Sequence, residues 1–67
     1  MWIIVTDTRN IKRYINLENI DEFYLNGEET CICIRHSMIA VKGDITKKLM
    51  EILRMTGVGV KQIGAGE

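Results

Sequence analysis

The stretch "IDEFYLNGEETCICIRHSMIAVK", residues 20–42, decides the fold, because strand-forming side chains fill most of it. Turn-forming residues interrupt these apolar runs, as expected of short strands in series. Asn26-Gly27 is the strongest hairpin signal in the chain, since both residues tolerate the positive φ of a type I′ turn. Strands are therefore expected at residues 20–25 and 30–35. Residues 38–42 either continue the second strand or, after a turn at 35–37, form another one, and the turn is the preferred interpretation.

Upstream of this stretch, two short strands are expected on either side of a polar turn. "WIIVT" (2–6) is a β-branched run, and "DTRN" (7–10) contains residues that favour turns. "IKRYI" (11–15) would be the returning strand. A polar corner, "NLEN" (16–19), then leads into the stretch above, with Leu17 and Ile20 able to point inward.

Downstream, the spacing of apolar residues changes from that of strands to that of a helix. Asp44 is a good N-cap residue, because its side chain can accept hydrogen bonds from the free amides of a first turn. Gly57 is suited to the position just after a helix. The spacing therefore predicts an amphipathic helix over about residues 44–56. Its apolar stripe would consist of Ile45, Leu49, Ile52 and Leu53, with Lys47, Lys48, Glu51 and Arg54 on the other side.

These elements predict an α+β fold, an antiparallel four- or five-stranded β-meander with one C-terminal α-helix packed on one face. Residues 1–57 would form this single domain. Residues 58–67, "VGVKQIGAGE", are glycine-rich and are expected to be either a frayed tail or a short edge strand. A chain of 67 residues buries only about 60 % of the surface that its unfolded form exposes, so a partner subunit is expected to add stability.

The composition narrows the classes of function. Nine basic and nine acidic residues cancel to a net charge of zero, whereas general nucleic-acid binders need an excess of Lys and Arg. The N-terminus offers no secretion signal, and no window reaches the roughly 18 apolar residues of a membrane span. We therefore expect a cytoplasmic protein, in which the two cysteines stay reduced.

Alternation along the expected strands sorts their side chains onto two faces. One face is apolar and can be covered by the helix, with Ile11, Ile15, Phe23, Leu25, Ile32, Ile34, Ile39 and Val41 as the expected core. The opposite face is also apolar, although a face without a covering helix normally reads polar. Because one helix cannot cover both faces, this second face is expected to be a partner or dimer interface. Its residues are Tyr14, Tyr24, Cys31, Cys33, Met38 and Ala40.

Cys31 and Cys33 lie close to His36, the only histidine of the chain. A structural zinc site needs four ligands and a catalytic site three plus water, whereas these residues offer three, on two faces of a continuous strand. A catalytic cysteine would need an activating base, and only His36 could serve. We therefore expect two free thiols that behave as small apolar side chains, with no metal, no cofactor and no enzymatic activity.

The charges are unevenly distributed along the chain. The acids Glu18, Asp21, Glu22, Glu28 and Glu29 occur without an intervening base. They belong either to solvated loops or to an acidic face for a basic partner, such as a nucleic-acid-binding protein that the chain inhibits. A local basic patch is the contrasting interpretation, and its residues would be Arg9, Lys12, Arg13, Arg35, Lys42, Lys47 and Lys48.

The segment "IKRYINLENIDEFYLNGEETCICI", followed by "VKGDITKKLMEIL", resembles small β-meander-plus-helix proteins of Firmicutes and their phages. Among these, the FlbD/swarming-motility family has a similar apolar strand, an N-x-x-x-I corner, an acidic third strand and a final helix. The resemblance covers about residues 3–53 and implies a non-enzymatic accessory role. A phage or mobile-element gene is one origin that it implies.

The sequence thus predicts a small non-enzymatic protein-interaction module. It is expected to self-associate, with a dimer as the simplest assembly, and to bind or inhibit a larger protein. A nucleic-acid-binding regulator that uses the local basic patch is the first alternative. A thiol or metal sensor that uses Cys31 and Cys33 is the second.

Overall fold

The computed structural model describes residues 1–64, and its chain begins with a β-hairpin. Strand β1 (Trp2–Thr6) pairs antiparallel with β2 (Lys12–Asn16), and a short 3₁₀ helix over Leu17–Asn19 follows. Asn16 starts this turn, because its side chain accepts a hydrogen bond from the Glu18 N–H at 3.1 Å. The turn buries Leu17, so the inward placement expected for this residue is confirmed.

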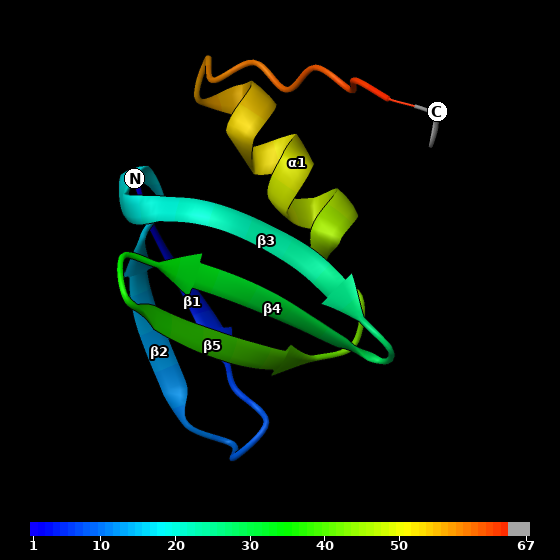
Figure 1. Ribbon diagram of the computed structural model, residues 1–67. Helices are drawn as coiled ribbons and strands as arrows, with labels where there is room; N and C mark the ends of the chain where they lie inside the picture. The colour runs from blue at the N-terminus through cyan, green and yellow to red at the C-terminus, as the bar shows by residue number, and fades with distance from the viewer. Residues whose placement is uncertain (65–67) are drawn as a thin grey trace.

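The stretch that decides the fold forms a second, three-stranded sheet (Figure 1). Its strands are β3 (Ile20–Asn26), β4 (Glu29–Ile34) and β5 (Ser37–Lys42), antiparallel and in the order β3-β4-β5. A β-bulge interrupts the register between Ile20 and Glu22. The reversal after Ile34 confirms the turn expected at residues 35–37.

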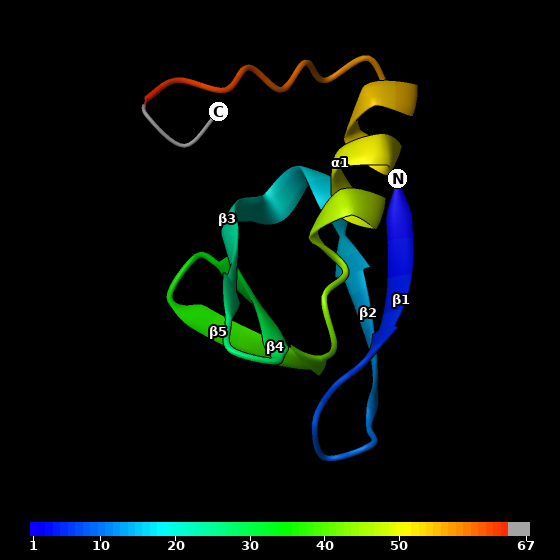
Figure 2. The same cartoon turned by 90° about the vertical axis from the view of Figure 1, so that its right-hand side faces the viewer.

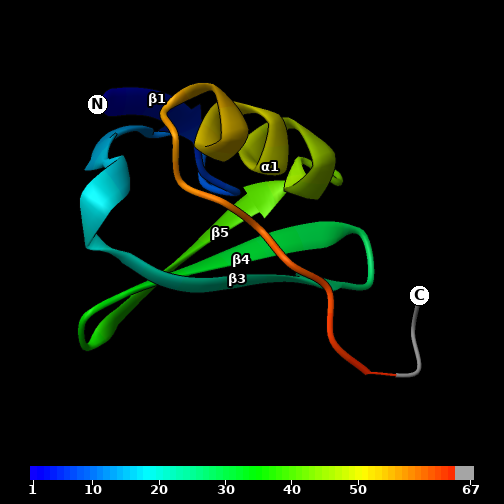
Figure 3. The ribbon, with the colours of Figure 1, turned by 90° about the horizontal axis from the view of Figure 1, so that it is seen from above.

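One core lies between the two sheets and the helix. Figure 2 shows the β1–β2 hairpin on one side and the three-stranded sheet on the other, and Figure 3 shows α1 (Thr46–Met55) lying over the opening between them. All three parts contribute buried side chains, namely Val5, Ile15, Ile32, Ile39, Val41 and Leu49. The α+β class with one C-terminal helix is therefore confirmed. No helix within residues 1–64 is long and apolar enough to cross a membrane.

Within residues 1–64, the five strands form two sheets, which backbone hydrogen bonds join at one junction. An isolated bridge pairs Asp7 with Val41, and the Thr8 N–H donates to the Ala40 carbonyl oxygen at 2.9 Å. Beyond this junction β1 diverges from β5. The hairpin thus covers the same face of the three-stranded sheet as the helix, which alternation along one strand at a time could not reveal.

Two residues expected in the core are exposed. Ile11 precedes β2 at the end of the hairpin loop and is 47 % exposed, and Leu25 lies near the open end of β3 and is 48 % exposed. Both follow the alternation of inward residues, but they lie at strand ends where no other element covers them. The prediction was therefore wrong for Ile11 and Leu25, whereas the buried positions expected for Ile15, Ile32, Ile39 and Val41 are confirmed.

The β3–β4 turn lies one residue later than the sequence predicted. Asn26 pairs with Glu29, so the loop consists of Gly27 and Glu28. Gly27 has φ 64, and a glycine with positive φ at the first loop position is typical of a type II′ turn. The type I′ turn expected over Asn26-Gly27 is corrected accordingly.

The β4–β5 turn has a comparable shape but places a non-glycine residue at its first position. Arg35 has φ 55, and its N–H donates to an Asp21 carboxylate oxygen at 2.6 Å. A side chain with Cβ pays a conformational cost at this φ that glycine does not.

We expect Arg35→Gly to raise the free energy of unfolding by about 0.5–1 kcal/mol, because the backbone bond to Asp21 is kept while the strain is relieved. Urea unfolding followed by circular dichroism measures the change. His36→Gly is the matched control, because His36 does not have a positive φ. That control should lower stability, and equal effects of the two substitutions would contradict the explanation.

Two side chains shape the start of α1. The Asp44 carboxylate accepts from the Thr46 N–H at 3.0 Å and from its hydroxyl at 2.6 Å. The helix begins at Thr46, and its N-cap is Ile45, which forms no side-chain cap bond, so the prediction of Asp44 as the N-cap was wrong by one residue. The buried Thr30 hydroxyl donates to the Gly43 carbonyl oxygen at 2.7 Å and accepts from the Ile45 N–H at 2.9 Å. Thr30 therefore fixes the connection from β5 to the helix.

The helix ends in a Schellman motif. The Gly57 N–H donates to the Arg54 carbonyl oxygen and the Val58 N–H to that of Leu53, each at 3.0 Å, and Gly57 has φ 85 as its position requires. Residues 58–64 then run outward without forming a strand, as Figure 1 shows. The edge strand considered for residues 58–67 is thus not formed over 58–64, and 65–67 lie outside the described residues.

Candidate interaction surface

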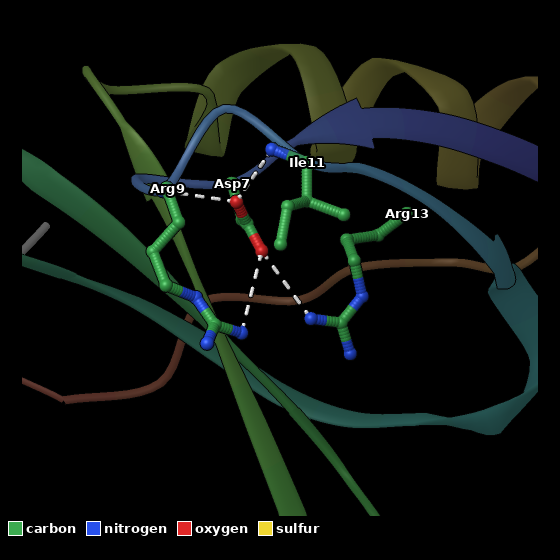
Figure 4. A network of polar contacts seen from close by, with 4 residues as sticks. All are labelled: Asp7, Arg9, Ile11 and Arg13. Carbon is green, nitrogen blue, oxygen red and sulfur yellow. Dashed lines mark hydrogen bonds and ion pairs between the residues drawn. The ribbon is translucent and has the colours of Figure 1, made fainter.

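Asp7 organises the loop that joins β1 to β2 (Figure 4). One carboxylate oxygen accepts hydrogen bonds from the N–H groups of Arg9 and Ile11, both at 2.9 Å. The other oxygen lies 3.3 Å from Arg13 Nη1 and 4.0 Å from Arg9 Nη2. The loop also contains Asn10 with φ 67. These bonds hold the loop in one conformation and so fix the position of the hairpin against β5.

Asp7 is only 6 % exposed, and the N–H donors and the Arg13 guanidinium around it compensate the negative charge of its carboxylate. The Ile11 N–H is the main cause that lowers the pKa of Asp7, and the Arg9 N–H and the Arg13 side chain lower it further against the opposing effect of burial. The sequence indicated only a turn former at this position. The signal that could have revealed this role is an Asp at the start of a short loop, where its side chain can accept hydrogen bonds from the amides two and four residues later.

The solvent side of the three-stranded sheet, here called the sheet outer face, consists of Glu22, Tyr24, Cys31, Cys33, Met38 and Ala40. In the strand register, Tyr24 is opposite Cys31, and Cys31 is opposite Ala40. The Tyr24 hydroxyl reaches across β4 and donates to the Met38 sulfur at 3.6 Å. Five of the six residues expected at an interface are therefore brought together on this face.

Cys31 is 2 % exposed within the single chain. Its hydrogen bond with Tyr24 raises the pKa of that phenol, and the Tyr24 side chain lies over the thiol on its way to Met38. The expectation that Cys31 is buried by another chain is therefore corrected, because the fold itself covers it. Large side chains on neighbouring strands can shield a small residue between them, which strand alternation alone does not predict.

Cys33 is the more accessible of the two free thiols. Burial raises its pKa, and the nearby Glu22 carboxylate raises it further. We expect a thiol reagent such as Ellman's reagent to modify one cysteine per folded chain at pH 8, slowly, and the second only after urea is added. Cys33→Ser should abolish the first reaction and Cys31→Ser should leave it. Equal rates for both thiols in the folded protein would contradict this assignment.

Metal-ligating residues do not converge in the part of the chain that the structure describes. Within residues 1–64, no three side chains of His, Cys, Asp or Glu are grouped so that they could hold a metal ion. Cys33 lies on β4, whereas His36 lies in the turn between β4 and β5.

The solvent side of the β1–β2 hairpin is a second apolar surface, here called the hairpin outer face. Trp2, Ile4 and Tyr14 are 68 %, 60 % and 67 % exposed, and Ile4 is directly opposite Tyr14 in the strand register. Tyr14 was expected beside Tyr24, but the two tyrosines belong to different sheets. The outer faces of these sheets point away from each other in Figure 2, so the single interface predicted from the sequence is divided into two.

The acidic residues follow β3 from one end to the other. Glu18 precedes the strand and lies 3.7 Å from the Met1 amino group, Asp21 accepts the Arg35 N–H, and Glu28 and Glu29 lie at the far turn. They therefore border an edge of the sheet rather than forming a compact cluster.

The basic residues are dispersed over the molecule. Arg9 and Arg13 face Asp7, and Lys12 begins β2. Arg35 and Lys42 lie at opposite ends of β5, and the helix carries Lys47 and Lys48. The patch expected from the sequence is therefore not gathered on one element.

A groove runs along the edge of β1 where this strand diverges from β5. Its volume is about 330 Å³, at the lower end of the range for ligand sites. Apolar side chains line its floor, among them Val5, Val41, Ile45, Leu49 and Ile52. The sequence analysis did not predict it, because its walls come from β1, β5 and α1, which are far apart in the chain.

Comparison of the chain with protein-family models, with curated proteins and with solved structures finds no match in any of the three. The resemblance to the FlbD/swarming-motility family therefore stays a prediction.

Proposed function

We propose that this protein is a non-enzymatic interaction module that self-associates and binds a larger protein through its apolar outer faces. The observation that carries the proposal is the hairpin outer face, where Trp2, Ile4 and Tyr14 are exposed side by side on two paired strands. Contiguous apolar surface on a small protein is typical of interaction sites, and aromatic side chains are enriched in the energetic centres of protein interfaces.

The distribution of charge supports a protein partner over a nucleic acid. The hairpin contains two arginines, Arg9 in its loop and Arg13 in β2, and both face the Asp7 carboxylate. Arg35 and Lys42 are separated by the full length of β5, so they do not act on the same stretch of a phosphate backbone. The net charge of zero supports the same conclusion.

The proposal is tested by affinity capture from a lysate of the source cells with the wild-type protein and with Trp2→Ser/Tyr14→Ser. Both side chains are exposed in the chain, so their loss should leave the fold intact and remove most of the apolar contact area. We expect the wild type to retain a defined protein and the double variant to lose it. Light scattering of the same samples gives the mass of the assembly across micromolar concentrations.

The matched control is Met55→Ser/Ile63→Ser, which removes two apolar side chains that are 81 % and 87 % exposed but belong to the helix and to the segment after it, not to either sheet. This control should bind as the wild type does. Equal loss in both double variants would show non-specific adhesion. A wild-type monomer at all concentrations would refute self-association, and nanomolar binding of DNA or RNA near physiological salt would favour the nucleic-acid alternative.

A further inference from the structure

The edge of β1 that faces the groove carries backbone groups directed away from the hairpin. Hydrogen bonds from the Leu17 N–H to the Met1 carbonyl at 2.8 Å and from the Asp7 N–H to the Ile11 carbonyl at 2.9 Å show that odd-numbered residues of β1 face β2. The N–H and C=O groups of Trp2 and Ile4 must therefore point to the opposite edge, because these directions alternate along a strand. No strand within residues 1–64 pairs with that edge at Trp2 or Ile4.

This edge lacks the features by which soluble proteins protect free strand edges. Charged side chains, prolines and bulges usually perform that task. β3 has Asp21, Glu22 and a bulge, and β2 has Lys12 and Arg13. β5 has Lys42, and its free edge is already bonded to the hairpin loop at Ala40 and Val41. β1, "WIIVT", contains no charge, no proline and no bulge. The β1 edge is therefore the one best suited to pair with an added strand.

The groove beside this edge provides the second half of a strand-binding site. An added strand that pairs with β1 would direct every second side chain to the inner side of the sheet, since side chains alternate with a period of two. On that side lie Val41 from β5, Ile45 just before the helix, and Leu49 and Ile52 from the helix. Alternate side chains of the added strand should accordingly be apolar.

The charges that line the groove are all positive. Lys42 at the end of β5 and Lys48 on the helix both contribute to its walls, both are exposed, and no acidic residue lines it. Neither lysine forms an ion pair within residues 1–64. An entering segment with carboxylates near its end would meet complementary charge.

From these observations we infer that the groove binds an extended segment of a partner protein by strand addition to β1, and that this segment combines alternating apolar residues with acidic ones. Main-chain hydrogen bonds to Trp2 and Ile4 would supply affinity, and the apolar floor and the two lysines would supply specificity. The inference rests on the proposed function and identifies the chemistry of the partner. It uses the main chain of Trp2 and Ile4 and the groove beside β1, whereas the hairpin outer face consists of the side chains of Trp2, Ile4 and Tyr14.

The probe is an acetylated nine-residue peptide in which valine and threonine alternate and two glutamates follow at the C-terminal end. Its control has the two glutamates replaced by lysines. We expect the acidic peptide to bind, with an NMR titration perturbing the amides of Trp2 and Ile4 more than those of Ile3 and Val5. The lysine peptide should bind at least about tenfold more weakly, because two surface charge contacts change from attraction to repulsion.

Two sets of variants locate the site. Lys42→Glu/Lys48→Glu should reverse the preference, so that the lysine peptide becomes the tighter ligand. Ile4→Pro removes the edge N–H and should abolish binding, whereas Ile4→Ala loses the side chain but keeps the N–H and should bind within about threefold of the wild type. Because Ile4→Pro could also disturb the strand, circular dichroism and the charge reversal provide independent readings.

The outcomes separate this inference from the proposed function. If neither peptide binds, or if both bind equally without perturbing Trp2 and Ile4, strand addition at this groove is refuted. Capture of the partner protein that depends on Trp2 and Tyr14 but not on Lys42 and Lys48 would leave the proposed function standing and overturn the inference. A dimer of the wild type in light scattering that dissociates on Ile4→Pro would assign the β1 edge to a second copy of the chain. That result would also overturn the inference.

Discussion

Thr30→Val should lower the free energy of unfolding by about 3 kcal/mol, because it leaves two partly buried backbone groups without partners and buries no polar group in exchange. The Thr30 side chain is fully buried, and its hydroxyl is bonded to both the Gly43 carbonyl oxygen and the Ile45 N–H. The free energy of unfolding of a 67-residue domain is roughly 3–10 kcal/mol in total, so this loss is a large share of its stability. Urea unfolding followed by circular dichroism measures it.

Thr30→Ser is the matched control, because it keeps the hydroxyl and removes one methyl group. It should cost about 1 kcal/mol. A valine variant as stable as the serine variant would show that the hydroxyl contributes little. Since Thr30 sets the connection before α1, the valine variant should also weaken binding in the groove, whose wall includes Ile45.

Asp7→Asn should lower the melting temperature at neutral pH by on the order of 10 °C and should flatten the acid side of the stability profile. The Ile11 N–H, the Arg9 N–H and the Arg13 side chain favour the charged carboxylate and so lower the pKa of Asp7 in the folded state. A carboxyl group of this kind stabilises the fold fully above its unfolded pKa of about 3.9. That contribution is lost as the pH falls through the lower, folded value.

The urea midpoint of the wild type should therefore fall steeply below about pH 4, and that of Asp7→Asn should fall less. Asp44 also has a lowered pKa, chiefly because the Thr46 hydroxyl and N–H donate to it, so it contributes to the remaining slope. Asp44→Asn is the control, and its profile should stay steeper than that of Asp7→Asn. Parallel profiles for the wild type and Asp7→Asn would contradict the role given to Asp7.

Local patterns were sufficient to predict the strands, the helix and its end. β1 lies at residues 2–6 as expected, the stripe of Leu49, Ile52 and Leu53 faces inward, and Gly57 terminates the helix. Each of these depends on side chains that are close in the chain. The turn at Gly27 was displaced by one residue because Asn26-Gly27 and Gly27-Glu28 both place a glycine where φ is positive.

Contacts between distant residues account for what the sequence did not reveal. Alternation placed Tyr14 and Tyr24 on one face because it assumed a continuous sheet, but the strands separate into two sheets beyond Thr8 and Ala40. The burial of Cys31 beneath Tyr24 depends on how one side chain crosses β4. The groove likewise needs α1 to be placed beside β1, and no pattern within either element records that placement.

The junction between Asp7 and Val41 has a consequence for the order in which the protein folds. The hairpin and the three-stranded meander are each built from neighbouring segments with short loops, so their ordering entropy is small, whereas the junction brings together residues from opposite ends of the sheet system. Our hypothesis is that the meander forms first and that the junction closes near the end of folding. Native-state hydrogen exchange should then show the Thr8 amide exchanging through a partial opening at lower free energy than the amide of Ile32. If both amides required global unfolding, closure would belong to the same cooperative step. If the Thr8 amide exchanges at the lower free energy, the junction opens transiently in the folded protein. Such opening would expose more of the β1 edge and would set the rate at which a partner strand can pair with it.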